Sequence, residues 1–324
     1  SETHRDWSHF NRFGPQDQFV QQRVQAAHIS TLSVQGHWYF FRQGLGMERG
    51  FDVVDTEAAP KAVAAQADRS VTSDKLSDRA IGLLSKPENA GRQFYLWVHY
   101  VDPHSEYVRH PGFDFGPGNR DLYEGEVAFT DHHVGRLLDF IEKSSFADRT
   151  AVIFTSDHGE AFGEHGMIRH GFELWEELVR VPLIFRVPGA AAHKVFERRS
   201  IIDVVPTILD LLRVAKPTGV GSDFLSGESL LFDLLLPPSY QPPKRVIFVD
   251  MAAGPHNAER QAFIENDYKL IASSSRVLGL YHLSNDPGEK HDLSQEHSLT
   301  SKIADRFRAF RRTLREVHVA PTPE

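Results

Sequence analysis

Hydrophobic positions in the first two thirds of the chain fall into two kinds of run. Short apolar runs rich in aromatic and β-branched side chains are typical of buried strands, and apolar residues at near-helical spacing indicate amphipathic helices. The predicted strands are residues 94–101, 150–155 and 181–187, and the predicted helices are residues 124–142, 172–179 and 201–212. This alternation predicts an α/β domain with a mostly parallel sheet flanked by helices.

The pattern changes after about residue 236. Residues 237–243 contain four prolines, which make a stiff, extended linker because proline fixes φ and lacks the N–H donor. Beyond the linker, short strand-like runs and one basic helical run predict a small antiparallel sheet with a helix, with Asn266-Asp267 as a hairpin turn. The predicted strands are residues 245–250, 261–265, 268–273 and 278–283, and the predicted helix is residues 299–317. We therefore expect two domains, residues 1–236 and residues 237–324.

Composition narrows the class of protein. The 324 residues are 40% hydrophobic and 25% charged, which is typical of a folded globular chain. A formal net charge of −8 argues against a dedicated nucleic-acid binder, which would need clustered Lys and Arg. No apolar run approaches the roughly 20 residues of a membrane-spanning helix, and the first residues lack the pattern of an export signal. Because the sequence has no cysteine, disulfides, thiolate metal sites and a cysteine nucleophile are excluded for these residues.

The chain contains 18 histidines, and their clusters are the first indication of chemistry. Asp157 and His158 directly follow the strand predicted at residues 150–155. Ligands bind at the carboxyl ends of parallel strands, and a carboxylate beside an imidazole is a sound pair of metal ligands. Gly159 lets the backbone turn sharply enough for both side chains to face one ion. The alternative is that Asp157 caps the next segment and His158 is a turn residue.

A glycine-rich loop with further histidines follows this pair. It contains His165 and His170, and loops on a rigid scaffold often carry functional residues. His170 stands next to Arg169, so we expect it to help hold an anionic group. The alternative for His165 is a place in a solvated, glycine-rich lid.

A second candidate group follows the strand predicted at residues 94–101. Pro103 fixes the backbone so that His104 projects from the strand end, and an imidazole changes protonation near neutral pH. His104 is therefore a candidate general acid or anion donor. His99 lies within the strand and is better explained as a hydrogen-bonded core residue. His37, which follows another apolar run, is a weaker candidate for the site.

Two other polar groups are better explained by structure than by chemistry. Asp131, His132 and His133 lie on a predicted helix whose apolar stripe faces elsewhere, so we expect a solvated or capping face. The arginine-rich run 306–315 fits the exposed side of an amphipathic helix.

Several motifs occur in the order found in one enzyme family. They are residues 95–104 (YLWVHYVDPH), 123–131 (YEGEVAFTD), 155–160 (TSDHGE), 163–166 (GEHG), 180–184 (RVPLI), 203–207 (DVVPT) and 281–287 (YHLSNDP). Each motif alone is modest, but together they extend over nearly the whole chain. In this order the chain resembles the sulfatases of the alkaline phosphatase superfamily.

The resemblance implies an alkaline-phosphatase-like fold and a hydrolase of sulfate or phosphate esters that uses one divalent ion and an activated nucleophile. By this resemblance, Asp157 and His158 match the late pair of metal-site residues. His104 matches the histidine that contacts the ester or assists the leaving group. His170 falls near the cationic residue that holds the transferred group, and His37 lies in the segment that supplies a Lys and a His.

The chain departs from the family pattern in its first part. Sulfatases begin with a strand that carries two adjacent aspartates, followed by a Cys or Ser nucleophile in a C/S-x-P-x-R motif. This sequence has no aspartate pair and no such motif, because Ser85 and Pro87 are followed by Asn89 where the motif has Arg. We therefore expect an incomplete portion of the enzyme, with a missing N-terminal part as its partner. Family habit favours a periplasmic or extracellular location.

The resemblance leaves the metal and the reaction open. Many relatives have Asn after the late metal aspartate, which suits calcium, whereas His158 favours manganese or zinc. We expect one divalent ion, Ca, Mn or Zn. The leading hypothesis is hydrolysis of a small-molecule or glycan sulfate ester. The alternatives are a phosphodiester or phosphonate monoester hydrolase on the same scaffold, and a noncatalytic domain that retains half a site.

Overall fold

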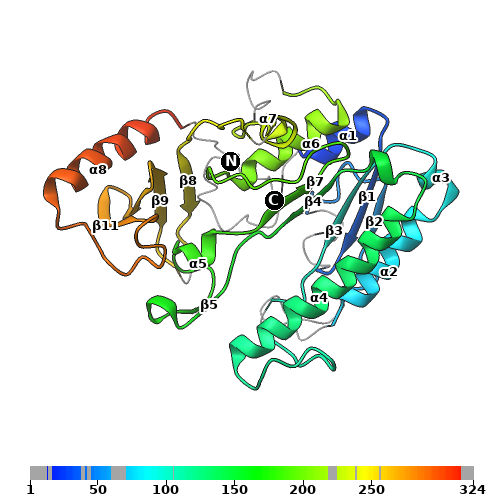
Figure 1. The fold of residues 1–324 in the computed structure, drawn as a ribbon, viewed down its shortest axis with the longest axis horizontal. Helices are drawn as coiled ribbons and strands as arrows, with labels where there is room; N and C mark the ends of the chain where they lie inside the picture. The colour runs from blue at the N-terminus through cyan, green and yellow to red at the C-terminus, as the bar shows by residue number, and fades with distance from the viewer. Residues whose placement is uncertain are drawn as a thin grey trace, which may run out of the picture. The chain divides into compact units, whose positions relative to one another are not determined.

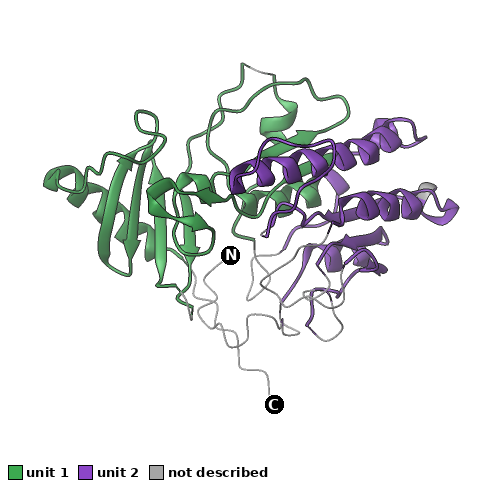
Figure 2. Cartoon of the chain, turned by 90° about the horizontal axis from the view of Figure 1, so that it is seen from below, with its two compact units in different colours: residues 1–10, 152–210, 224–324 green, residues 11–151, 211–223 purple. Residues whose placement is uncertain are grey.

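The structure is a computed structural model of the chain, and it describes residues 13, 17–37, 41, 45–59, 71–104, 106–217, 225–237, 239–254 and 257–314. The chain forms two compact units, which Figure 2 shows in different colours. Unit 1 consists of residues 1–10, 152–210 and 224–324, and unit 2 consists of residues 11–151 and 211–223. The boundary predicted at residue 237 lies inside unit 1, and the division into residues 1–236 and 237–324 stays a prediction. Within the described ranges, no helix combines the length and the apolar character that crossing a membrane requires.

Unit 2 is built on a parallel sheet with the strand order β2-β1-β3 (Figure 1). Its strands are β1 (Ser30–Gln35), β2 (Val53–Asp55) and β3 (Phe94–His99). Its helices are α1 (Val20–Ala26), α2 (Ser73–Leu84), α3 (Pro87–Ala90) and α4 (Asn119–Glu142), with the 3-10 turn η3 (Ala147–Arg149). β1 and β3 pair from Ser30 and Phe94 to Gln35 and His99, so the residues after both strands emerge at the same edge of the sheet.

The core of unit 2 lies between this sheet and the helices α2 and α4. Leu32 and Val34 of β1 belong to one buried cluster with Leu76 and Ala80 of α2 and Leu137 of α4. After its first residue, β1 is buried at every position, as expected for the central strand of a sheet that is covered on both faces. The sheet ends that carry the candidate histidines of this unit are thus fixed by a packed core.

Helix α2 begins where a side chain from beyond β3 reaches its first turn. The Asp102 carboxylate accepts hydrogen bonds from the backbone N–H groups of Thr72 and Ser73, both at 2.8 Å, and from the Thr72 hydroxyl at 2.5 Å. A helix start leaves such N–H groups without an intrahelical partner. α2 is absent from the sequence-based prediction, because its cap lies about thirty residues further along the chain.

Helix α4 confirms the helix predicted at residues 124–142, but it begins at Asn119. The Asp121 carboxylate accepts a hydrogen bond from the Gly118 N–H at 2.9 Å. This contact caps the helix from within its own first turn. The helix therefore extends further at its start than the apolar spacing indicates.

Unit 1 contains strands and helices from the rest of the described chain (Figure 1). Its strands are β4 (Val152–Thr155), β5 (Ala161–Phe162), β6 (Ile168–Arg169), β7 (Leu183–Arg186), β8 (Ile247–Met251), β9 (Arg260–Glu265), β10 (Tyr268–Ser273) and β11 (Arg276–His282). Its helices are η4 (Glu164–Gly166), α5 (Glu176–Val179), η5 (Ile201–Asp203), α6 (Val204–Leu212), α7 (Leu231–Leu235) and α8 (His297–Arg311). The end of α6 falls in unit 2.

β4 and β7 confirm two predicted strands, but their direction differs from the expected parallel order. They pair antiparallel, from Val152 and Arg186 to Thr155 and Leu183. The chain between them turns back through β5, β6 and the short α5, whereas parallel neighbours usually need a crossover helix. The parallel arrangement therefore holds for β1, β2 and β3.

Helix α5 is shorter than the helix predicted at residues 172–179. Trp175 is extended, with φ −66° and ψ 157°, and the helix begins at Glu176. The N–H of Glu176 donates to the Glu289 carboxylate at 2.6 Å, so the start of α5 is set by a residue more than a hundred positions away.

The C-terminal part of unit 1 confirms the predicted antiparallel sheet with a helix. The strand order is β11-β10-β9-β8, and Asn266 and Asp267, with φ 48° and 69°, make the turn between β9 and β10. Phe263, Leu270 and Phe307 belong to the core that joins this sheet to α8.

Helix α8 is shifted toward the N-terminus relative to the predicted range of residues 299–317. It begins two residues earlier, at His297, and ends six residues earlier. It ends at Arg311, and the N–H and hydroxyl of Thr313 both donate to the Phe310 carbonyl. A hydroxyl that donates a hydrogen bond to one of the last helix carbonyls favours termination of the helix there. Residues 315–324 lie outside the described residues.

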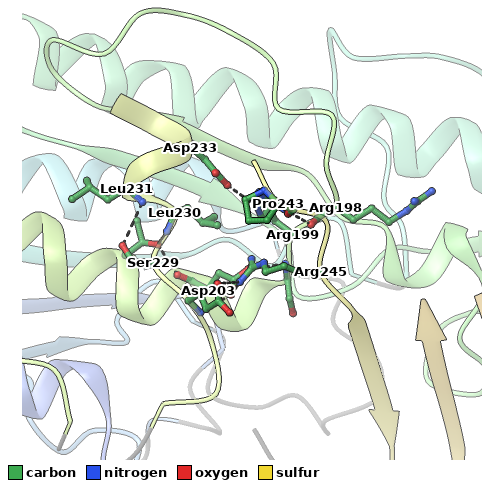
Figure 3. A network of polar contacts seen from close by, with 12 residues as sticks. Arg198, Arg199, Asp203, Ser229, Leu230, Leu231, Asp233, Pro243 and Arg245 are labelled. Carbon is green, nitrogen blue, oxygen red and sulfur yellow. Dashed lines mark hydrogen bonds and ion pairs between the residues drawn. The ribbon is translucent and has the colours of Figure 1, made fainter. Parts of the chain in front are cut away.

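A buried carboxylate fastens the start of α6 in unit 1 (Figure 3). Asp203, which is 1% exposed, accepts hydrogen bonds from two backbone N–H groups at 2.9 and 3.0 Å and from the Arg245 guanidinium. Arg199 pairs with Asp233 at 2.5 Å beside it. Buried charges are stable only when paired in this way, so this network holds three segments of unit 1 together.

Candidate functional site

Asp157 and His158 lie directly after β4. The Oδ2 atom of Asp157 is 3.6 Å from Nε2 of His158, and the two side chains are 78% and 39% exposed. Nδ1 of His158 donates a hydrogen bond to the Gly159 carbonyl at 2.9 Å, which leaves the lone pair of the neutral ring on Nε2. The pair therefore presents a carboxylate oxygen and an imidazole nitrogen side by side.

His170 packs onto the same turn. The rings of His158 and His170 are stacked, with centroids 4.0 Å apart. Nδ1 of His170 donates to the Glu160 carboxylate at 3.1 Å, and the side chain of Glu160 is 4% exposed. The structure thus brings Asp157, His158 and His170 together, and the roles assigned to them stay predictions.

The turn after His158 lies against helix α5. The Gly159 N–H donates to the Leu178 carbonyl at 2.8 Å. A Cβ atom on Gly159 would lie 2.0 Å from the Glu177 carbonyl oxygen, a distance that no side chain tolerates. Glycine is therefore required here for close approach of two backbone segments.

A second group of ionisable side chains lies beside α5 and is absent from the sequence-based prediction. Ligand atoms of His165, Glu177 and Glu289 lie within 4.8 Å of one another. Nζ of Lys269 lies 2.9 Å from Oε1 of Glu289, so an ammonium already supplies positive charge at this place. The ring of His165 stacks on Trp175, with ring centroids 3.9 Å apart, and the residue as a whole is exposed.

No sequence signal marks this second group. Glu289 stands in a polar loop and Lys269 in an amphipathic strand, and both positions are typical of solvent-facing residues. Only the fold shows that the Lys269 and Glu289 side chains are both 0% exposed.

His37 and His104 lie in unit 2, where they follow the neighbouring parallel strands β1 and β3. The Gly36 N–H donates to the His99 carbonyl at 2.9 Å, so the pairing continues to the ends of both strands. Both candidate side chains are half-buried. Their assignment as acid or anion donor stays a prediction.

Two polar groups predicted to face solvent or to cap a helix lie as expected in the described residues. Asp131 and His132 are exposed on α4, and half-buried His133 accepts a hydrogen bond from Arg136 at 3.0 Å. Arg306 and Arg308 on α8 and Arg312 directly after it are exposed, as expected for the solvent side of an amphipathic helix.

The donor set after β4 fits a divalent ion. Two ligand atoms that each lie about 2.1 Å from one tetrahedral ion are about 3.4 Å apart. The distance between Asp157 Oδ2 and His158 Nε2 is 3.6 Å. The hydrogen bond from His158 Nδ1 to the Gly159 carbonyl orients the ring, as hydrogen bonds to the other ring nitrogen usually do for histidine ligands.

Two protein-family models match the chain. The model described as sulfatase matches residues 14–214, which is more than half of the chain. The model described as N-sulphoglucosamine sulphohydrolase, C-terminal, matches residues 163–316.

Curated relatives are longer than this chain. The uncharacterized sulfatase YidJ of Escherichia coli is 26% identical over 302 residues, with 74% of this chain and 58% of YidJ covered. Arylsulfatase K of Mus musculus is 31% identical over 227 residues, with 64% of this chain and 39% of that protein covered. The matched part of the chain thus spans a little more than half the length of YidJ and less than half the length of arylsulfatase K.

Solved structures of similar fold include enzymes of two kinds. BT4656, solved in complex with its substrate D-glucosamine-2-N,6-O-disulfate, has a TM-score of 0.72 and 18% identity, with 94% of this chain and 83% of that chain covered. Phosphonate monoester hydrolase of Agrobacterium radiobacter has a TM-score of 0.70 and 15% identity, with 94% and 82% covered. At this identity they show the alkaline-phosphatase-like fold alone. Because the family model spans residues 14–214, the chain belongs to the sulfatase family of hydrolases.

Proposed function

We propose that this chain forms part of a metal-dependent hydrolase of sulfate esters, with Asp157 and His158 as ligands of one divalent ion. The observation that carries the proposal is the 3.6 Å separation of Asp157 Oδ2 and His158 Nε2, together with the hydrogen bond from His158 Nδ1 to the Gly159 carbonyl. This separation suits two ligands of one ion, and the hydrogen bond favours the tautomer that a metal ligand needs.

The histidines around the sheet ends supply protons and hydrogen bonds. His170, held by buried Glu160, is assigned to the transferred sulfuryl group, whose nonbridging oxygens accept hydrogen bonds. His104 is assigned to the leaving-group oxygen, where an imidazole donates a proton near neutral pH. His37, at the end of the neighbouring strand, is kept as a further candidate catalytic residue.

The metal would offset negative charge on the ester oxygens. A mixed carboxylate and imidazole donor set suits manganese or zinc better than calcium, which prefers oxygen ligands. We therefore expect Mn²⁺ or Zn²⁺ in preference to Ca²⁺.

Sulfated saccharides are the substrate class that we propose to test first. One structure of similar fold contains D-glucosamine-2-N,6-O-disulfate, and another is described as a 2-O GAG sulfatase. The nucleophile is not assigned to a residue of this chain, because the sequence contains neither Cys nor the Ser-x-Pro-x-Arg motif.

A phosphonate or phosphodiester hydrolase is the second candidate. It is favoured by the fold similarity to two phosphonate monoester hydrolases, with TM-scores of 0.68 and 0.70, and by an imidazole in the late metal pair. The protein of the complete reading frame, assayed with 4-nitrophenyl sulfate and with a phenyl phosphonate ester, separates the two. A preference for the phosphorus ester by orders of magnitude would overturn the sulfatase proposal.

The metal assignment is tested on the chain itself. Mn²⁺ binding, measured by electron paramagnetic resonance of the free ion, should show one weak site, because two protein ligands bind weakly. In Asp157→Asn and in His158→Ala the affinity should fall about tenfold or more. Asp131→Asn, an exposed carboxylate on α4, is the control and should leave binding unchanged. Equal affinity in all four proteins would contradict the assignment.

A further inference from the structure

Lys269 is a buried residue near the start of β10, an interior strand of the C-terminal sheet of unit 1. Its side chain is 0% exposed, and Nζ lies 2.9 Å from Glu289 Oε1 and 3.0 Å from Glu176 Oε1. Removing an ammonium and a carboxylate from water costs several kcal/mol each, and replacement of such a pair by apolar residues is often neutral or stabilising. Stability alone therefore does not explain why a lysine stands here.

The two carboxylates connect Lys269 to the start of helix α5. Oε2 of Glu289 accepts the backbone N–H of Glu176 at 2.6 Å, and the Glu176 side chain accepts a hydrogen bond from Lys269. Both the main chain and the side chain of Glu176 are thus tied to β10 and to the loop after β11. α5 has no freedom to slide along the sheet while these contacts hold.

Helix α5 also fixes the position of residues 157–159, which include the candidate metal ligands. The Gly159 N–H donates to the Leu178 carbonyl at 2.8 Å, and there is no space between Gly159 and the Glu177 carbonyl. The Gly159 carbonyl accepts the hydrogen bond that orients the His158 ring. A shift of α5 would therefore move the carbonyl on which the tautomer and the direction of His158 depend.

Two further contacts hold the segment before α5 to the same sheet. Arg260 of β9 donates to both oxygens of Glu173, at 2.7 to 2.9 Å. Trp175 packs edge to face on Tyr281 of β11, with centroids 5.5 Å apart. The C-terminal sheet thus holds the returning loop at several points, and the Lys269 contacts are the most buried of them.

A second metal ion beside α5 does not explain these residues. His165, Glu177 and Glu289 have ligand atoms close together, but the Lys269 ammonium lies 2.9 Å from Glu289 and would repel a cation there.

We propose that Lys269 and Glu289 are positioning residues, which fix the orientation of His158 by clamping α5 against the turn at Gly159. The proposal rests on the proposed function in one respect, namely that His158 is a ligand. The positioning itself concerns only contacts within unit 1. Neither residue is assigned a contact with metal or substrate.

The test compares the intact chain with the double variant Lys269→Met/Glu289→Met. This variant removes both charges and the acceptor of the Glu176 N–H, and it keeps unbranched side chains of similar length. Hydrogen exchange is measured by mass spectrometry on the peptides that contain residues 157–160 and β9–β10, and Mn²⁺ affinity is measured as above. We expect exchange at residues 157–160 to rise about tenfold. Mn²⁺ affinity should fall about tenfold, as it does when a group that orients a metal ligand is lost. Protection of β9 and β10 should be kept.

The matched control is Arg199→Met/Asp233→Asn, a pair in the same unit whose side chains are each 9% exposed. It should leave exchange at residues 157–160 and Mn²⁺ affinity unchanged. If the double variant loses protection throughout unit 1, the milder Glu176→Gln variant, in which Lys269 keeps Glu289, decides by the same local readout.

The outcomes separate the positioning proposal from the proposed function. Unchanged exchange at residues 157–160 in the variants, or an equal rise in the control, overturns the positioning. If the intact chain binds no Mn²⁺, the metal assignment fails, whereas a selective rise in exchange at residues 157–160 still supports the clamp.

Discussion

Gly159 is a glycine of the candidate site that leaves no space for a side chain. We predict that Gly159→Ala displaces the turn or α5, because the new Cβ would meet the Glu177 carbonyl oxygen at 2.0 Å. The free energy of unfolding, measured by urea denaturation, should fall by about 1–3 kcal/mol, the usual cost of overpacking. Mn²⁺ affinity should fall with it, because the His158 ring is oriented by the Gly159 carbonyl.

Gly82 supplies the matched control for this substitution. It lies within α2, and a Cβ there would have no heavy atom within 4 Å. Gly82→Ala should stabilise the chain by up to about 1 kcal/mol, the difference in helix propensity. If the two alanines had the same effect, the close approach at Gly159 would not be the cause.

At the scale of elements, the start of α2 depends on one carboxylate outside the helix. Asp102→Ala removes the acceptor of the Thr72 and Ser73 N–H groups, and Asp102 is 3% exposed. Loss of such a cap costs about 1–2 kcal/mol, and we expect this fall in the free energy of unfolding by urea. Hydrogen exchange should rise in the first turn of α2.

Asp78 on the same helix is the control for the Asp102 substitution. It pairs with Arg136 at the surface, and the two side chains are 61% and 39% exposed. Surface ion pairs contribute between zero and about 1 kcal/mol, so Asp78→Asn should change stability little. An effect as large as that of Asp102→Ala would mean that α2 responds to its total charge and not to the cap.

How far the sequence predicts an element depends on where its ends are fixed. β9 and β10 are predicted nearly to the residue, because their pattern and the Asn266-Asp267 turn are local. α5 and α2 are not, because Glu289 and Asp102 act from 113 and about thirty positions away. Side-chain spacing carries no information about such contacts.

The residues of the candidate site also differ in whether local sequence predicts them. Asp157, His158 and His170 can be found from sequence because polar residues after an apolar run are conspicuous, and the turn is local. Lys269 is hidden, because a lysine in a strand normally faces solvent. Its burial follows from the register of β10 between β9 and β11, which only the assembled sheet defines.

At the scale of the whole molecule, two histidines whose pKa is lowered in the folded chain make stability depend on pH. Burial lowers the pKa of His110, against the opposing effect of the Asp102 and Asp74 carboxylates. Burial also lowers the pKa of His133, with the charges of Arg136 and His132 acting in the same direction and the same two carboxylates against it. In the unfolded chain both rings protonate near their ordinary pKa of about 6.5.

Between the lowered folded values and about pH 6.5, the unfolded chain therefore binds more protons than the folded chain. Stability rises with pH in that window and falls as the pH is lowered through it. His110→Gln removes one of the two titrating groups, so its urea-unfolding free energy should fall less steeply below pH 6.5 than that of the unchanged protein. His193 is the control, since the carbonyls of Ala191 and Asp233 raise its pKa, and its contribution is lost only as the pH rises above about 6.5. His193→Gln should leave the slope of the unfolding free energy below pH 6.5 unchanged. If His110→Gln has the same slope as the unchanged protein, the pH dependence comes from other groups.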